Sequence, residues 1–399
     1  MRGRNRAEKP VCAIARSEDA KEAVFDALSR IDLPDLAGKR LLLKPNIGRN
    51  VAARMGIDTN PDVTEAVFDF LRVRFDASYF IGDSPIMGVN CREAFVTSGH
   101  GGFLDRKDIT FVDLDAKKPI TLPIDDGRVL KKIKVTGSLY DFDYIISIPV
   151  LKMHMHTGAS LGYKNMKGML YKREKVKLHQ LHVPEAKEAY GHKELDLAIA
   201  DLAMVLEPDL VVCDATYAME GMGPSAGDRR QLDIVLASTD YLAADIVALA
   251  IVGLGIDHVP HLKLIAERKG GPSSLEDITT VPDDVTPFST GFAVPPTEIV
   301  IQNQMVNLLD EGSCSACQSS VYLFLKNNEA LIGEYIGRHG HFNIAIGSDI
   351  EDVPDDTFLI GNCTVCHKEK GTFLIGCPPS QTIIMETLRE ILDEGANDA

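Results

Sequence analysis

The chain has 399 residues, of which 45% are hydrophobic and 25% charged, with 42 Lys and Arg against 58 Asp and Glu. This composition is typical of a folded protein of two or three domains. The formal charge of −16 argues against a general nucleic-acid-binding protein, because affinity for phosphate backbones needs a positive surface. Apolar runs are shorter than a membrane span, and the basic first residues lack the apolar core of a signal peptide. We therefore expect a cytoplasmic protein that binds neither nucleic acid nor membrane.

Short apolar runs alternate with amphipathic segments through residues 1–290. The predicted strands, some with a following turn, are 39–48, 77–85, 109–115, 142–152 with a stop at Pro149, 210–221 and 229–240. The predicted helices are 61–75, 194–209 and 241–255, and the first has an apolar face made of Val63, Val67, Phe70 and Leu71. Strands and helices in this order predict a large α/β domain with a largely parallel sheet.

A segment rich in glycine and proline follows, and after it comes a smaller unit. Residues 269–296 are rich in Gly, Pro, Ser and Thr, which predicts a linker or an extended crossover. Residues 297–399 again have an α/β pattern, with strands expected at 298–304, 341–349, 355–363 and the start of 371–394, and helices after Cys314 and at the end of 371–394. The sequence therefore predicts a second, smaller α/β domain that carries most of the cysteines and ends in an acidic tail.

Five of the eight cysteines lie close together in this second domain: Cys314, Cys317, Cys363, Cys366 and Cys377. A chain of this size builds its own core, so the cluster indicates a metal or redox site rather than disulfide bonds. Each group is expected where a strand ends or a helix begins, because free backbone N–H groups there favour thiolates and sulfide. Cys12, Cys91 and Cys213 are not expected to bind metal: the first and last lie in strand-like runs and Cys91 in a polar loop.

Two metals compete for this site. Two Cys-x-x-Cys pairs would satisfy a structural zinc ion. A [4Fe–4S] cluster commonly takes its last thiolate from a distant cysteine followed by proline, and Cys377 precedes Pro378. The fifth cysteine therefore favours the iron–sulfur cluster, with Cys366 as the cysteine that is not needed. Zinc and a reactive dithiol stay open as alternatives.

A basic, histidine-rich segment spans residues 151–193, with nine Lys and Arg, three Glu and five His. A cationic segment in an acidic chain is a candidate site for a small anion. Its glycines and small residues would let the backbone approach a ligand, and its histidines and lysines would supply proton transfer and fixed charge. The candidates here are His154, His156, Gly158, Ser160, Gly162, Lys164 and Lys167. Lys172, Arg173, Lys175 and Lys177 are interpreted instead as a solvated loop.

Further candidates lie outside this segment. Lys44 and Asn46 follow the first strong strand. Glu220 opens a flexible Glu-Gly-Met-Gly-Pro turn and is predicted to form a wall of the pocket. Asp83, Asp214, Asp240 and Asp245 follow strands, where aspartate also caps helices, so these four have two equally good interpretations.

The motifs LLLKPNIG, TNPDVTEAVFDFL, YFIGDSP and DYIISIPVLKMHMHTGASLGYKNMKG, followed by VVCDATYAMEGMGP and IGCPPS, resemble the DUF362 family in the same order over roughly residues 40–390. Members of that family are generally described as iron–sulfur proteins of unassigned activity. Many carry an extra ferredoxin-type run of cysteines, which this chain lacks. The resemblance implies an iron–sulfur protein, and it gives no support to multi-cluster electron transfer.

One loop is also similar to the nickel-pincer lactate racemases, where a His, nine intervening residues and a Lys frame a glycine-rich loop. His154 and Lys164 have this spacing. The similarity implies that Lys164 anchors a cofactor or contacts an anion, and that His154 is a proton shuttle or a ligand. The racemases do not show this cysteine unit, and we do not extend nickel chemistry to the chain.

The leading hypothesis is an iron–sulfur oxidoreductase or Lewis-acid enzyme that acts on a small anionic substrate in a pocket between the two domains. His154, His156, Lys164 and Glu220 would be catalytic, while Lys44, Asn46, Gly158, Ser160, Gly162 and Lys167 would bind substrate or cofactor. An electron-donor protein would be a partner. Two alternatives stay open: a non-catalytic metal-binding partner or sensor protein, and a racemase-like or isomerase-like enzyme with a structural metal. The sequence leaves the oligomeric state open.

Overall fold

The computed structural model describes residues 9–295, 303–379 and 381–397. The chain forms two compact units, a larger one of residues up to 178 and 183–295 and a smaller one of residues 179–182 and from 296 onward. The expected start of the second domain at residue 297, and most of the strand expected at 298–304, lie outside the described residues.

The larger unit is built on a ten-stranded sheet whose main path has the order β12-β1-β11-β10-β7-β2-β3-β4, while β8 pairs with β10 and with β9. The strands β7, β2, β3 and β4 are parallel neighbours, whereas β11 is antiparallel to both β1 and β10. The expectation of an α/β domain with a largely parallel sheet is therefore confirmed. The strands are β1 (Val11–Arg16), β2 (Arg40–Pro45), β3 (Ser78–Asp83), β4 (Thr110–Asp113), β7 (Tyr144–Ile148), β8 (Val150–His154), β9 (Gly158–Ser160), β10 (Leu210–Glu220), β11 (Asp228–Ser238) and β12 (Thr279–Val281), with a separate hairpin of β5 (Ile120–Pro123) and β6 (Lys132–Val135).

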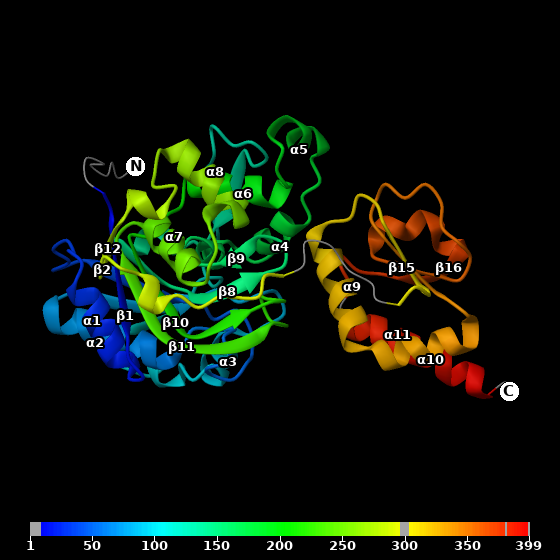
Figure 1. The fold of residues 1–399 in the computed structure, drawn as a ribbon, viewed down its shortest axis with the longest axis horizontal. Helices are drawn as coiled ribbons and strands as arrows, with labels where there is room; N and C mark the ends of the chain where they lie inside the picture. Colours follow the sequence, from blue (N-terminus) through cyan, green and yellow to red (C-terminus); the bar gives the residue numbers. More distant parts are fainter. Residues whose placement is uncertain (1–8, 296–302, 380, 398–399) are drawn as a thin grey trace. The chain divides into compact units, whose positions relative to one another are not determined.

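Helices cover both faces of this sheet (Figure 1). The helices α1 (Ala20–Ser29), α2 (Pro61–Arg74) and α3 (Cys91–Thr97) lie on one face, and α6 (Glu194–Ala203), α7 (Tyr241–Ile251) and α8 (Pro260–Lys269) lie on the other. Two short helices, α4 (Glu174–His179) and α5 (Pro184–Tyr190), follow the basic loop. Because helices cover both faces of the sheet, the loops gather at its edge, at the carboxyl ends of the parallel strands.

The helix α2 forms where its sequence predicts it. The Asn60 side chain accepts a hydrogen bond from the backbone N–H of Asp62, and Pro61 occupies the first turn, where its missing N–H costs nothing. All four residues of the predicted apolar face are buried and belong to the core beneath the sheet. Burial of each such side chain stabilises the fold by about 1.5–3 kcal/mol.

Two expectations are corrected by the structure. The strand does break at Pro149, which has no N–H to donate, but the chain resumes as β8, which runs to His154 and pairs with β10 and β9. The segment 269–296 is not only a linker, because three residues with good strand propensity form β12, a parallel partner of β1.

The smaller unit has a parallel sheet in chain order, β13 (Val306–Asp310), β14 (Phe342–Ile346), β15 (Thr357–Ile360) and β16 (Gly371–Leu374). Its helices are α9 (Ser315–Asn327), α10 (Glu329–His339) and α11 (Gln381–Asn397), so the expected acidic tail continues as helix through Asn397. Phe324, Phe342 and Phe358 lie at the centre of its core and are almost fully buried. The expectation of a smaller α/β unit is confirmed.

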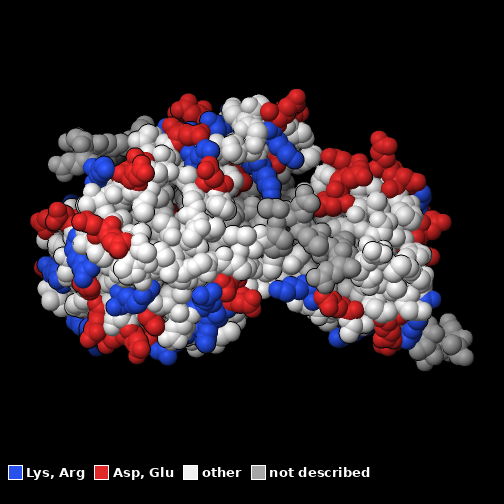
Figure 2. All heavy atoms as spheres, in the orientation of Figure 1, with Lys and Arg blue, Asp and Glu red and all other residues white. Residues whose placement is uncertain are grey.

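Charge is unevenly distributed between the two units. Residues 297–399 hold 16 of the 58 acidic residues and 5 of the 42 basic ones. Figure 2 shows acidic side chains gathered along the upper edge of the smaller unit in this view. The net charge of this unit therefore favours a basic partner over an acidic one.

Candidate functional site

The strand order of the larger unit defines where a ligand site is expected. The chain runs β2, β3, β4 outward in one direction and then returns to place β7 on the other side of β2. Ligands of open α/β sheets bind at such a switch point, outside the carboxyl ends of the strands. Lys44 and Asn46 leave β2 at this point, and Lys152 lies on β8 beyond the end of β7.

A buried ion pair joins the ends of β2 and β3. The Lys44 Nζ is 2.7 Å from the Asp83 Oδ1, and the two side chains are 0% and 2% exposed. Lys44 also donates to the Asn165 Oδ1 at 2.9 Å. Asp83 accepts the backbone N–H groups of Ile47 and Ser84, each at 2.8 Å. Burial lowers the pKa of Lys44, and the Asp83 charge opposes this. Asp83 thus acts as the counter-ion of Lys44 rather than as a helix cap.

A second group, which sequence reasoning missed, surrounds Asn46. The Lys152 Nζ donates to the Asn46 Oδ1 at 2.6 Å and to the Ile57 carbonyl at 2.5 Å. Asp58 lies nearby, and its Oδ1 accepts the Gly48 N–H at 2.9 Å. The Asp58 Oδ2 is buried without a hydrogen-bond partner among the described residues. Burial raises the pKa of Asp58 to about 6 and lowers the pKa of Lys152 to about 8.

The basic loop brings two more lysines to this edge of the sheet. The Lys164 Nζ donates to the Thr157 Oγ1 at 2.6 Å and has no carboxylate within ion-pair distance in the part of the chain that the structure describes. Burial, and then the charges of Lys167 and Lys152, lower the pKa of Lys164 well below its usual value. Burial, and then Lys175, lower the pKa of Lys167 to about 8. Together with Lys44, these lysines make a buried positive region that an anion would stabilise.

The predicted histidines and small residues form the β8–β9 hairpin. The ring centroids of His154 and His156 are 5.9 Å apart, and the His156 N–H donates to the His154 Nδ1 at 3.2 Å. Because this nitrogen accepts, the neutral His154 ring carries its proton on Nε2. Gly158 has a φ of +76° and packs so closely against the His258 carbonyl that no side chain fits. Ser160 pairs with Lys152 across the hairpin.

Two other predicted residues are held by protein contacts. The Gly162 N–H donates to the Asp245 Oδ1 at 2.7 Å, and Asp245 also accepts the Tyr163 N–H. Glu220 ends β10 and forms a bidentate ion pair with Arg230 at 2.9 and 2.8 Å, while the Ala293 N–H donates to one of its oxygens. These bonds give Gly162 and Glu220 structural roles, and their predicted roles toward a ligand stay predictions.

The interpretation of Lys175 as a solvated residue is wrong. It is 8% exposed, and its Nζ lies 3.1 Å from the Asp115 Oδ2 and donates to the Ser84 hydroxyl. No local pattern of residues signals these contacts, because both partners lie at the ends of β3 and β4, far away in the chain. Cys91 is likewise not in a polar loop: it begins α3, is buried, and donates to the Asp83 carbonyl.

The cysteines of the smaller unit follow the carboxyl ends of its parallel strands. Cys314 comes after β13 and is the N-cap residue of α9, while Cys317 lies buried in the first turn. Cys363 follows β15, and Cys377 follows β16. Carboxyl ends of parallel strands meet at one edge of a sheet, so these four residues gather there.

Contacts between the cysteine loops support this convergence. A Cβ on Gly361 would lie 3.3 Å from the Cys317 Sγ. The Asn362 N–H donates to the Gly376 carbonyl at 2.9 Å, and the Gly376 N–H donates to the Asn362 Oδ1 at 2.9 Å. These bonds place the loops that carry Cys363 and Cys377 beside each other.

The thiols of this cysteine group shift one another's pKa values. Hydrogen bonding with Cys317 lowers the pKa of the Cys314 thiol. The same bond raises the pKa of Cys317, and Cys377 and Cys363 add to the rise. Cys363, Cys366 and Cys377 are all exposed. Among the described residues, no group of three or more His, Cys, Asp or Glu is arranged to hold a metal ion.

None of the eight cysteines, all of which the structure describes, forms a disulfide bond. Cys12 and Cys213 are fully buried, and burial raises the pKa of each thiol. The three cysteines outside the smaller unit therefore behave as small hydrophobic residues.

Residues 41–250, just over half of the chain, match the family described as domain of unknown function DUF362, and the chain belongs to this family. The matched region includes the buried lysines and ends before the cysteines of the smaller unit. The family resemblance read from the sequence is therefore confirmed.

Among curated proteins, the chain is 29% identical over 240 residues to the thylakoid-associated protein sll1697 of Synechocystis, which covers 60% of this chain and 71% of the relative. Two solved structures are also similar: a protein from Thermotoga maritima, with 14% identity and a TM-score of 0.35, and the lactate racemase apoprotein of Thermoanaerobacterium thermosaccharolyticum, with 11% identity and a TM-score of 0.38. Each match covers 64% of this chain, and the chain spans about 60% of the length of each solved structure.

Helices long and apolar enough to cross a bilayer are absent from the described part of the chain.

Proposed function

We propose that this member of the DUF362 family binds a [4Fe–4S] cluster through Cys314, Cys317, Cys363 and Cys377. The observation that carries the proposal is that loops following three parallel strands bring these cysteines to one edge of the smaller sheet. The N-terminus of α9 lies beside two of them, where free backbone N–H groups stabilise thiolate and sulfide. Four cysteine thiolates are the donor set that such a cluster takes.

The donor set favours a cluster over zinc. Around a single zinc ion, bonds of about 2.3 Å would hold four sulfurs within about 3.8 Å of one another. A four-iron cluster distributes its thiolates over four iron atoms, so it accepts wider spacing. The proline after Cys377 also matches the pattern of iron–sulfur ligands. When bound, the cluster would supply electron-transfer or Lewis-acid chemistry.

We propose that the larger unit binds the small anionic substrate of this redox or Lewis-acid enzyme. Lys152 and Lys164 offer donors at the switch point, and Lys44 adds charge held in place by Asp83. His154, with its proton on Nε2, is the candidate for moving a proton. An electron-donor protein would dock through basic residues, given the acidity of the smaller unit. Cysteines that form no disulfide bonds suit a reducing compartment such as the cytoplasm.

Anaerobic purification tests the cluster. We expect a brown protein with absorbance near about 400 nm and equal amounts of iron and sulfide. Cys317→Ser and Cys377→Ser should lose the iron, while the matched variant Cys366→Ser should retain it. A colourless protein that contains one zinc ion would refute the proposal.

Thermal shift with small anions, namely phosphate, sulfate and acetate, tests the substrate site. At least one anion should stabilise the wild type by mass action and lose this effect in Lys164→Ala and His154→Ala. If both variants respond to every anion as the wild type does, the substrate part of the proposal fails while the cluster part stands.

A further inference from the structure

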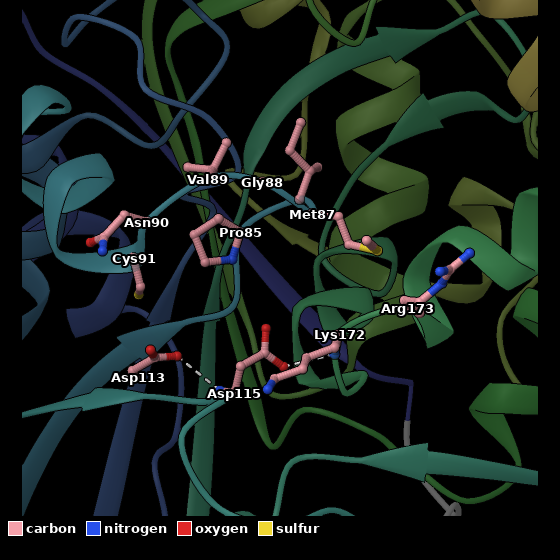
Figure 3. A pocket seen from close by; sticks show the side chains of 11 residues that line it. Pro85, Met87, Gly88, Val89, Asn90, Cys91, Asp113, Asp115, Lys172 and Arg173 are labelled. Atoms are coloured by element: carbon pink, nitrogen blue, oxygen red, sulfur yellow. Dashed lines mark hydrogen bonds between the residues drawn. The ribbon is translucent and has the colours of Figure 1, made fainter. Parts of the chain in front are cut away.

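A pocket with a volume of about 410 Å³ opens at the carboxyl ends of β3 and β4 in the larger unit (Figure 3). Pro85, Met87 and Val89, from the loop between β3 and α3, form its apolar side. Its polar side is formed by Asp113 and Asp115, at and after the end of β4, and by Lys172 and Arg173, which precede α4. Pockets of about 300–1,000 Å³ with a mostly apolar wall and a few polar groups bind small organic molecules.

The two carboxylates of the pocket are already engaged by the protein. The Asp115 Oδ2 faces the buried Lys175 at 3.1 Å and accepts the Ser84 hydroxyl. The Asp115 Oδ1 accepts the Lys172 N–H at 2.8 Å, and the Asp113 Oδ1 accepts the Asp115 N–H at 2.9 Å. Asp115, which is engaged through both oxygens, therefore has little acceptor capacity left for a cationic ligand.

The two cations at the mouth, in contrast, have no carboxylate partner. Lys172 and Arg173 line the pocket and are exposed, and neither forms an ion pair within the ranges that the structure describes. Lys172 has a φ of +43°, uncommon for a residue with a side chain, and its backbone bond to Asp115 holds it there. With Lys175 included, three cations stand against the carboxylates of Asp113 and Asp115, so the site has a formal charge of +1.

Cys91 limits what the pocket can do. Its thiol lines the pocket and donates to the Asp83 carbonyl. Burial, together with the charges of Asp113 and Asp83, raises the pKa of this thiol, so it stays protonated and is a poor nucleophile. The pocket is therefore built for reversible binding.

We propose that this pocket binds a small organic monoanion, a carboxylate with an apolar body. The carboxylate contacts Arg173 and Lys172, and the apolar body packs against Pro85 and Met87. Figure 3 shows the Met87 side chain on the same side of the pocket as Arg173. One ligand can therefore place its apolar body against Met87 and its carboxylate against Arg173. This site goes beyond the proposed function, because it requires neither the cysteines nor the buried lysines around Asn46.

Isothermal titration of the full chain with benzoate tests the proposal, with benzyl alcohol as the uncharged probe of similar shape. We expect benzoate to bind at least about tenfold more tightly, because charge-assisted bonds to Arg and Lys are lost with the alcohol. The double variant Lys172→Gln/Arg173→Gln should weaken benzoate binding by about tenfold or more. Met87→Ser should weaken it several-fold. Arg229→Gln, an exposed arginine outside the pocket, should leave it unchanged.

Three results would overturn the inference: no binding of benzoate at millimolar concentration, equal affinity for benzoate and benzyl alcohol, or unchanged binding in the double variant. Loss of binding in Lys164→Gln with retention in Lys172→Gln/Arg173→Gln would locate benzoate at the buried lysines instead and would also refute it. Benzoate should still bind the Cys317→Ser protein, so failure of the cluster proposal and failure of this one are distinguishable.

Discussion

Replacing Gly168 with alanine tests whether the 3-10 helix Lys164–Met169 is built around the buried ion pair. A Cβ at this position would lie 2.5 Å from the Lys44 Nζ and would overlap the Asp83 Oδ1. Neither side chain can retreat at low cost. Both are almost fully buried, and the Asp83 oxygens also hold the N–H groups of Ile47 and Ser84.

The expected cost follows from these contacts. Forcing one methyl group into a filled site costs about 1–3 kcal/mol, and separating a buried ion pair costs about 3–5 kcal/mol. Because alanine would displace the pair without removing it, we expect a loss of about 2–4 kcal/mol in the free energy of unfolding of the larger unit. For a unit of this size this lowers the melting temperature by about 4–8 °C.

Far-UV circular dichroism is the suitable measurement, because the chain contains no tryptophan. Hydrogen exchange read by mass spectrometry should show faster exchange in residues 164–170. Gly102→Ala is the matched control, since an added Cβ there would meet no atom within 4 Å. A wild-type melting temperature for Gly168→Ala, with unchanged exchange in residues 164–170, would refute the reasoning.

Three further predictions concern single charges and glycines. Lys44→Met should be less stable in urea than Lys44→Met/Asp83→Asn, by about 1–3 kcal/mol, because the single change leaves a buried carboxylate without its cation; equal stability would argue against a tight pair. Burial raises the pKa of Asp58 to about 6, so its contribution to stability is present below the unfolded pKa and is lost as the pH rises through about 6. Between about pH 5 and pH 7 the wild type should therefore lose about 1 kcal/mol of unfolding free energy relative to Asp58→Asn, and parallel urea curves at both pH values would contradict this. In α10, Gly333→Ala and Gly337→Ala should each slow hydrogen exchange of the helix, with a gain of about 0.5–1 kcal/mol, since both positions are open and helical; faster exchange would count against it.

The candidate site was only partly accessible to sequence reasoning. The pattern of strong strands followed by loops points to Lys44, Asn46, Lys164 and Lys167, and the structure places them at the switch point. Lys152, by contrast, is not among the residues predicted from the sequence. Its partner Asn46 lies 106 residues away, and no local pattern reports such a contact.

Local periodicity and spacing by themselves determined the α/β class, the buried face of α2, and the grouping of cysteines after strands. These features depend on neighbours within a few turns or strands, so they are written in short stretches of sequence. Only the tertiary structure decided which charged groups are buried and what pairs with them. Lys175 reads locally as a solvated lysine, yet it becomes the counter-ion of Asp115, 60 residues away. Burial of a charge depends on which distant strands pack side by side, and its cost is offset only when a partner arrives from elsewhere in the chain.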